Sequence, residues 1–293
     1  MRLRYESNYD IHELQQRIIG NLIALDSVCN AHGLHYYLWA GTMLGAVRHK
    51  GFIPWDDDID VAMPRADYEL LLANCEEWMP APYKVIAPET DADYPYPFAK
   101  VEDVTTTVME RPDFKYLEGV YIDIFPLDGF PTEAKEQKRH YRLWKLWRHL
   151  LFMRCRDPFK HGHGPKSWFP WLLHQVVSKS YLQKKVKHYM THYDFEQSDF
   201  VVAYDDNGID AIFPKHIFGT PQLYEFEGHQ YKGVEHADEY LTINFGSDYM
   251  QLPPIEKRVQ HRFFHLDLNR PHCETTADEL LQARIYILYL IYI

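Results

Sequence analysis

The residues best suited to chemistry form an acidic segment, Trp55 to Asp60, which reads WDDDID. Side chains alternate between the two faces of an extended strand, so we expect Asp56, Asp58 and Asp60 on one face and Asp57 on the other. Carboxylates this close repel one another unless a divalent cation neutralises them. Oxygen-rich sites of this kind suit Mg²⁺ or Mn²⁺. The segment therefore predicts a metal site rather than a solvated acidic turn.

A lone acid, Asp123, lies between Ile122 and Ile124 in an apolar stretch. A buried carboxylate costs free energy unless a cation or a hydrogen-bond donor meets it. We therefore expect Asp123 to be a further metal ligand beside Asp58 and Asp60, or to accept the proton of an attacking hydroxyl. The alternative is an edge strand that turns Asp123 towards solvent.

The spacing of the aspartates also matches the first three liganding positions of an EF-hand calcium loop. The sixth position of that loop should be glycine and is Val61, and the twelfth should be glutamate and is Asp67. The mismatch at both positions disfavours a calcium loop.

Four more residues are suited to binding phosphate. Gly41 and Thr42 stand between a predicted strand and a predicted helix, where glycine allows close approach and helix N–H groups and the threonine hydroxyl can donate. Arg48 and Lys100 are cations suited to the charge that builds on a transferred phosphoryl group and its leaving phosphate. Each of these two cations could instead form an ordinary surface ion pair.

The elements that must position these residues follow from the hydrophobic pattern. Helical spacing of apolar residues predicts a helix from Ile11 to His32, which Gly33 ends. Gly41 and Thr42 form a tight turn in this interpretation. The pattern further predicts strands at residues 35–40, 59–63, 83–87, 98–110 and 120–126, and helices at residues 43–48 and 65–77; Pro64 and Pro126 end their strands. This order predicts an α+β fold, a mixed β-sheet flanked by helices.

The sequence changes character beyond Pro131. Residues 132–156 and 168–192 are rich in Lys, Arg, Trp and Leu and are predicted to be helical. We place a soft boundary here, between a core of residues 1–131 and a mostly helical part of residues 132–293.

Composition excludes several classes of protein. A formal net charge of -11 argues against a nonspecific nucleic-acid binder, although basic residues gather between Lys135 and Lys187, either as a solvated helical face or as a surface for an anionic polymer or lipid headgroups. No segment approaches the roughly 20 apolar residues of a membrane span. The apolar stretch Ile285 to Ile293 is expected to be buried, with an interfacial anchor as the alternative. Four widely spaced cysteines and no secretory signal favour a reducing cytoplasm.

The order of strand, Gly-Thr, helix, Asp-x-Asp strand and lone-Asp strand resembles the nucleotidyltransferase superfamily of the polymerase-beta type. The chain is more closely similar to the LicD family of phosphocholine transferases, which also resemble the fukutin-related proteins. The resemblance covers residues 10–265, leaves the last 25 residues or so unmatched, and is carried by four segments: WAGTMLGAVR from Trp39, GFIPWDDDIDV from Gly51, YIDIFPLD from Tyr121 and FGSDYMQLPP from Phe245.

The resemblance implies a nucleotidyltransferase-like sheet in residues 1–131, with residues 132–293 completing the cleft for donor and acceptor. It implies transfer of phosphocholine, or a similar phospho-alcohol, from CDP-choline or a related CDP-alcohol to a sugar hydroxyl of a glycan or glycolipid such as lipopolysaccharide or teichoic acid. CMP would be the leaving group. The resemblance further implies that the enzyme is cytoplasmic and can make peripheral contact with the inner face of the membrane. The implied ligands of Mg²⁺ or Mn²⁺ are Asp58, Asp60 and Asp123, with Asp56 as an outer ligand; Gly41, Thr42, Arg48 and Lys100 would meet the donor phosphates.

A choline group would need aromatic faces, because a quaternary ammonium binds through cation–π attraction. Trp39, Trp55, Tyr94 and Tyr96 lie near the motifs in sequence and are candidates for such a cage, although a chain with 22 tyrosines and seven tryptophans places aromatic residues near any site by chance. Further along, the candidates for contact with donor or acceptor are Asp248, Arg258 and His261, whereas Leu252 to Pro254 is expected to be structural. The pair His161 and His163 is too small a ligand set for a metal and is expected to lie in an exposed loop.

Three alternatives remain open at this point. A glycosyltransferase would use Asp-x-Asp with Mn²⁺ and would not need Asp123. A true nucleotidyltransferase would use the same three acids, with attack on the alpha-phosphate and pyrophosphate as the leaving group. A degenerate family member would only bind a glycan or a nucleotide, but the intact set of Asp58, Asp60 and Asp123 argues against it.

Overall fold

The computed structural model describes residues 9–204, 212–258, 260 and 262–283. Its first helix, α1 (Ile11–His32), begins and ends where the local sequence requires. The Asp10 carboxylate caps its first turn by accepting a hydrogen bond from the N–H of His12. Gly33 ends it with a φ of 69°, a left-handed conformation that glycine adopts without steric cost. The predicted bounds of this helix are confirmed.

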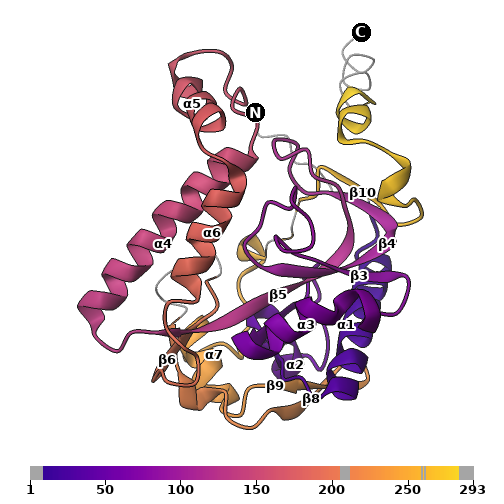
Figure 1. The fold of residues 1–293 in the computed structure, drawn as a ribbon. Coiled ribbons are helices and arrows are strands. Elements are labelled where there is room, and N and C mark those ends of the chain that lie inside the picture. Colours follow the sequence, from indigo (N-terminus) through magenta and orange to yellow (C-terminus); the bar gives the residue numbers. More distant parts are fainter. Residues whose placement is uncertain (1–8, 205–211, 259, 261, 284–293) are drawn as a thin grey trace.

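A curled mixed sheet forms the centre of the fold (Figure 1). The strands β2 and β5 are parallel, and every other pair is antiparallel. This architecture confirms the α+β class. Along its main path the order is β1 (Tyr37–Leu38), β2 (Asp60–Pro64), β5 (Glu118–Phe130), β4 (Ala99–Met109) and β10 (His265–Asp267); β3 (Tyr83–Ile86) pairs with β4, β6 (Phe200–Val202) with β5, and β7 (Ile212–Pro214) with β6.

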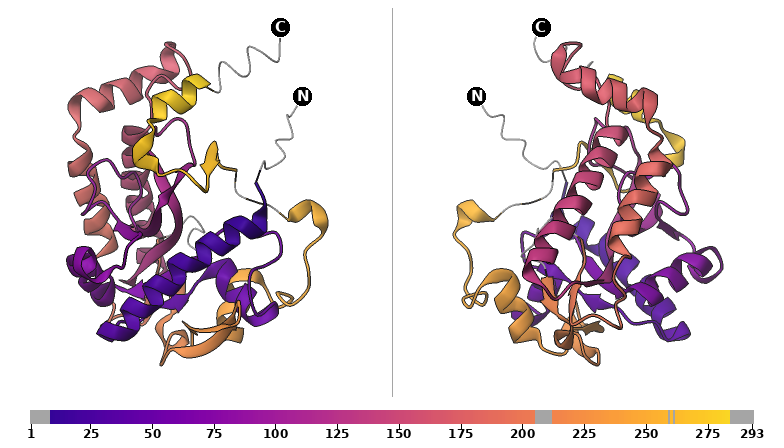
Figure 2. Two further views of the ribbon diagram at one scale, coloured as in Figure 1. Left: turned by 90° about the vertical axis from the view of Figure 1, so that its right-hand side faces the viewer. Right: turned by 60° about the vertical axis from the view of Figure 1, so that its left-hand side comes forward.

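Three helices from the first part of the chain cover this sheet. Helix α1 packs on β4 and β5, where the side-chain amide of Asn21 donates to the Val120 carbonyl at 2.7 Å. Helices α2 (Ala40–Arg48) and α3 (Arg65–Trp78) pack on β2. The main core lies between these helices and the sheet. Figure 2 shows the helices and the sheet from two further sides.

A helical protrusion stands on one side of the sheet and is built from α4 (Ala134–Cys155), α5 (Trp168–Val176) and α6 (Lys179–Met190) (Figures 1 and 2). It has its own core, in which Trp144 and Leu182 pack with Phe130 of β5. Residues 168–192, predicted to be helical, form two helices, because Ser178 accepts a hydrogen bond from the N–H of Tyr181 and starts α6.

The hairpin of β8 (Gln222–Phe226) and β9 (His229–Gly233) and helix α7 (Ala237–Phe245) lie in the lower part of the molecule in Figure 1. The 3₁₀ turn Pro165–Ser167 precedes α5, and further 3₁₀ turns form at Lys215–Ile217, Ile255–Lys257 and His272–Glu274. Strands β6, β7 and β10 come from beyond residue 131 and yet join the central sheet. The division at residue 131 therefore stays a prediction.

Two predicted boundaries are wrong. Helix α2 begins at Ala40, so Gly41 and Thr42 lie in its first turn rather than in a turn before it. Strand β5 continues past Pro126 to Phe130. Proline is tolerated because pairing with β4 ends at Ile124, so the strand needs no backbone donor on that side.

Within the described part of the chain, no helix has the length and apolar character needed to cross a bilayer. The apolar stretch Ile285 to Ile293 lies outside the described residues.

Candidate functional site

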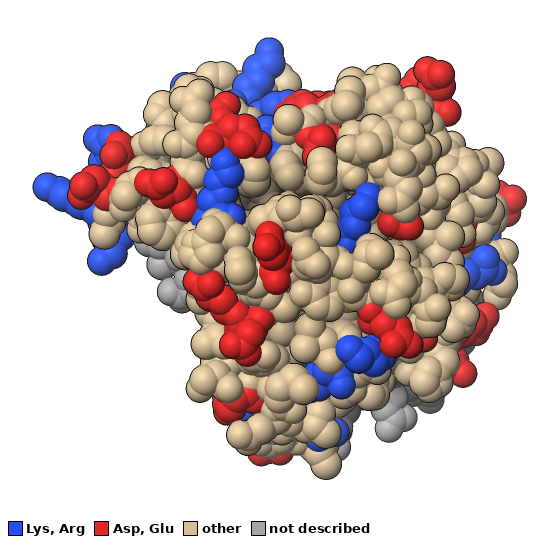
Figure 3. All heavy atoms as spheres, turned by 90° about the horizontal axis from the view of Figure 1, so that it is seen from below, with Lys and Arg blue, Asp and Glu red and all other residues tan. Residues whose placement is uncertain are grey.

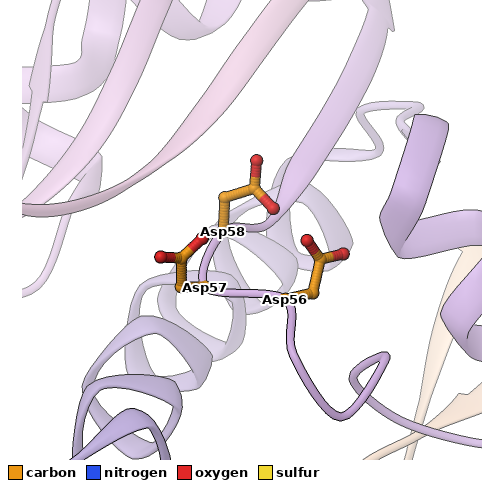
Figure 4. A group of neighbouring side chains, drawn as sticks. All are labelled: Asp56, Asp57 and Asp58. Carbon is orange, nitrogen blue, oxygen red and sulfur yellow. The ribbon is translucent and has the colours of Figure 1, made fainter. Parts of the chain in front are cut away.

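The acidic segment is a loop until Asp60, where β2 begins. Carboxylate oxygens of Asp56, Asp57 and Asp58 lie within 4.8 Å of one another (Figure 4). The expectation that Asp57 points away from this group is wrong, because the strand alternation behind it does not apply before Asp60. Three carboxylates at this spacing match the oxygen donors that a hard divalent cation requires.

Helix α1 and the residues before it hold this loop in place. The hydroxyl of Tyr9 donates to Asp57 at 2.9 Å, and the Gln15 amide donates to the carbonyl of Asp56 at 2.8 Å. Burial and the nearby charge of Asp57 raise the pKa of Tyr9 well above its usual value, so the phenol keeps its proton and remains a donor. Asp57 is almost fully buried, whereas Asp56 and Asp58 are partly accessible.

Asp60 and Asp123 are direct neighbours on the parallel strands β2 and β5. Because residues at the same register share a face, both carboxylates project from the same side of the sheet. The backbone around them is tied in two places: the N–H of Asp123 donates to the carbonyl of Ile59 at 3.0 Å, and the N–H of Asp60 donates to the Thr42 hydroxyl at 2.9 Å. The Asp123 side chain is 20% exposed, which leaves it accessible to a ligand.

The three acids predicted to converge are therefore only partly brought together. Register pairs Asp60 with Asp123, and the close carboxylate group consists of Asp56, Asp57 and Asp58. Among the residues that the structure describes, Asp58, Asp60 and Asp123 do not form a second group within 4.8 Å. Their shared use of one cation stays a prediction.

Lys100 lies on β4 opposite Asp123 and is 1% exposed. Its ammonium is 2.9 Å from Glu118, 3.3 Å from Glu110 and 3.9 Å from Asp123, and it lies 3.3 Å from the ring centroid of Tyr121. Burial alone favours the neutral amine, but the acids raise the pKa of Lys100 well above its usual value. The alternative of a surface ion pair is wrong for Lys100, because this lysine is buried beside Asp123.

Arg48 ends α2 and is tied to a distant loop. Its guanidinium donates to the carbonyls of Tyr249 at 2.6 Å and Gln251 at 3.2 Å. The guanidinium of Arg258 lies 4.4 Å from the ring centroid of Trp55. Residues 249–258 thus lie beside α2 and Trp55. Asp248 is exposed and His261 lies outside the described residues, and contact of the distal candidates with donor or acceptor stays a prediction.

The aromatic cage is not formed as predicted. Trp39 and Tyr94 are fully buried and cannot offer a face to a ligand. Tyr96 donates to Glu110 and its ring lies beside the Lys100 ammonium, so it belongs to the buried network. One face of Trp55 meets Arg258. The pair His161 and His163 lies in an exposed loop, as predicted.

Sequence reasoning missed Tyr9, Glu110 and Glu118, which hold the aspartates and Lys100. Glu118 precedes the predicted strand by two residues, and its nearness to Lys100 depends on the pairing of β4 with β5. A groove of about 940 Å³ was also unexpected. It is lined by Pro64, Asp67 and Lys215 among others, at the end of β2 remote from Asp60.

Gly41 packs against the acidic loop in a way that can be tested. A Cβ at this position would lie 2.9 Å from Oδ2 of Asp56, so Gly41→Ala is expected to displace that carboxylate and weaken Mg²⁺ binding about tenfold. Stability should not fall, because alanine favours a helix over glycine. Isothermal titration with Mg²⁺ and chemical denaturation measure the two effects. Gly164→Ala is the matched control, since its Cβ would meet nothing within 4 Å; equal Mg²⁺ affinity in both variants would contradict the assignment of Asp56.

Comparison with known proteins gives the family. A family model described as LicD/FKTN/FKRP, nucleotidyltransferase domain, matches residues 33–161, which include the predicted metal ligands and the predicted phosphate-binding residues. Lipopolysaccharide cholinephosphotransferase LicD of Haemophilus influenzae is 32% identical over 262 residues, or 84% of this chain and 94% of that protein. Ribitol 5-phosphate transferase FKRP of Homo sapiens is 42% identical over 50 residues, or 17% of this chain and 9% of that protein.

The match to the Haemophilus protein extends over nearly its whole length, and the family model covers the acidic loop, β2, β4 and β5. The chain therefore belongs to the LicD family.

Proposed function

We propose that the protein transfers phosphocholine, or a similar phospho-alcohol, from a CDP-linked donor to a sugar hydroxyl of a cell-surface glycan and releases CMP. As a member of the LicD family, the chain is a phosphotransferase. The observation that carries the finer proposal is the pairing of Asp60 with Asp123 beside a loop of three clustered carboxylates. The relative named a lipopolysaccharide cholinephosphotransferase favours choline as the alcohol and lipopolysaccharide as the acceptor.

Asp56, Asp58, Asp60 and Asp123 are the residues that would hold Mg²⁺ or Mn²⁺. When bound, such a cation neutralises the donor diphosphate and the charge that develops on the leaving phosphate. Asp57 lies within the carboxylate group but is buried and bonded to Tyr9, so its role is to fix the loop. We add it to the site as a positioning residue.

The placement of Asp123 supports a reaction in which this residue takes the proton of the acceptor hydroxyl. The sugar hydroxyl attacks the phosphorus that carries choline, and its proton passes to the Asp123 carboxylate. The bond from this phosphorus to the bridging oxygen breaks, and its electron pair leaves with CMP. The Lys100 ammonium lies 3.9 Å from the Asp123 carboxylate and helps to keep it oriented.

The donor phosphates would meet the first turn of α2. Gly41 presents no side chain there, the helix N-terminus carries partial positive charge, and Arg48 adds a cation at the other end of the helix. The Thr42 hydroxyl accepts from Asp60, so its contribution is to position that aspartate. Residues 1–131 would supply this chemistry, and residues 249–258 would close the donor side of the site.

Release of nucleotide from a panel of donors tests the proposal. Purified protein with Mg²⁺ and lipopolysaccharide should release CMP from CDP-choline faster than from CDP-ribitol or CDP-glycerol, and should not release UDP from UDP-sugars. Preference for CDP-ribitol is the second candidate, favoured by the relative named a ribitol 5-phosphate transferase. Turnover of UDP-sugars alone would replace the proposal with glycosyl transfer.

A further inference from the structure

Helix α5 exposes an apolar face that no part of the described chain covers. Its exposed side chains, here called the α5 face, are Trp168 (67%), Phe169 (56%), Trp171 (46%), Leu172 (49%) and Val176 (68%). The helix is held by Leu173, which is buried, and by a contact between His174 and the carbonyl of Met153. Five exposed apolar side chains on a nine-residue helix are costly in water, and contiguous patches of this kind mark interaction sites.

The segment around the α5 face is strongly basic. Between Gln137 and Met190 the sequence has thirteen Lys and Arg residues and a single acid, Asp157, in a chain whose formal net charge is -11. Lys166 is exposed just before α5, and Lys184 is exposed on α6. The opposite end of the molecule, seen from below in Figure 3, shows acidic and basic side chains interspersed. The protrusion that carries the α5 face is therefore strongly basic in sequence, within a chain that is acidic as a whole.

The α5 face also has a position suited to docking. In Figure 1, α5 stands at the end of α4 and α6 that is farthest from β6, and it projects beyond the sheet. Lys185 of α6 lies 5.5 Å from the ring centroid of Trp147 and 5.7 Å from that of Tyr181, which places a cation among aromatic rings on the same protrusion. Trp and Tyr favour the boundary between lipid and water, and Lys and Arg favour anionic headgroups.

We propose that the α5 face docks on the surface of an anionic lipid bilayer, with Trp168, Phe169 and Trp171 among the headgroups and the basic residues of the protrusion facing the lipid phosphates. An amphipathic helix that lies in the interface has this combination of aromatic and basic side chains. A second copy of the chain is disfavoured as the occupant, because two such faces would bring two basic segments together.

Vesicle sedimentation tests the proposal with the full-length protein. The wild-type protein should sediment with vesicles of equal parts phosphatidylcholine and phosphatidylglycerol, far less with phosphatidylcholine alone, and less as salt is raised. The triple variant Trp168→Ser, Phe169→Ser, Trp171→Ser should lose at least about tenfold in affinity. Leu223→Ser, which removes an exposed leucine from β8, is the matched control and should bind as the wild type does.

A second variant keeps the test decisive if the triple variant misfolds. Lys184→Glu with Lys185→Glu changes only charge on α6 and should also weaken binding to the anionic vesicles. Wild-type affinity in this variant and in a folded triple variant would overturn the proposal. Two other results would also overturn it: loss of binding only on removal of residues 284–293, or a dimer in light scattering that the triple variant converts to a monomer.

Discussion

An Asp123→Asn variant is expected to lose about a hundred- to ten-thousand-fold in turnover of CDP-choline, the range that a positioned general base contributes. Asparagine keeps the shape of the side chain but can neither take the proton of the sugar hydroxyl nor supply an anionic ligand. The fold should persist, because Lys100 keeps its contacts with Glu118 and Glu110. Turnover is measured as CMP release, and folding as the free energy of unfolding in urea.

Asp278→Asn is the matched control for this variant. Asp278 pairs with Lys115 at 2.7 Å on the surface, so its neutralisation should leave turnover unchanged. Wild-type turnover in Asp123→Asn would remove Asp123 from the reaction. A fall in both turnover and stability would instead assign Asp123 a structural role beside Lys100.

The largest effect on stability is expected from Arg65→Met. The guanidinium of Arg65 binds both oxygens of Asp128, at 2.7 and 2.6 Å, and so joins the start of α3 to the far end of β5. Asp128 is 1% exposed, and a buried carboxylate that loses its partner costs about 3–5 kcal/mol. Urea denaturation of Arg65→Met should show a loss of this size.

The double variant Arg65→Met with Asp128→Leu distinguishes the cost of an unpaired charge from the cost of lost packing around Arg65. Removing both charges leaves no unpaired group, so most of the lost free energy of unfolding should return. If the double variant is as unstable as Arg65→Met, the loss comes from packing around Arg65 rather than from the unpaired Asp128. Neither residue lies at the proposed catalytic site, so turnover per folded molecule should be unchanged in both variants.

Local patterns in the sequence predicted the elements well where a helix or strand is set by its own residues. The bounds of α1 follow from apolar spacing and Gly33, and those of α3 follow Pro64 closely. Strand β5 was predicted too short, because Pro126 was expected to end it. The proline is tolerated because β4 no longer pairs with β5 at this position, whereas β2 still does. That arrangement depends on long-range pairing, which local patterns do not contain.

In the site, too, local sequence identified single residues but not the contacts that depend on long-range pairing. The acidic loop and Asp123 were found from residue type alone, since carboxylates so crowded or so isolated in apolar surroundings require a partner. The side on which Asp57 lies was predicted wrongly, because strand alternation was applied to a loop. The network of Lys100, Glu110 and Glu118 could not be found without the register of β4 against β5.

The fate of the choline-bearing phosphorus tests the central claim most directly. CDP-choline labelled with ³²P at that phosphorus is incubated with the protein, Mg²⁺ and lipopolysaccharide, and the label is followed with and without EDTA. We predict that the label appears on the lipopolysaccharide in amounts equal to the CMP released, and that EDTA stops both. Label released as free phosphocholine, with CMP attached to the acceptor, would contradict phosphocholine transfer and establish nucleotidyl transfer instead.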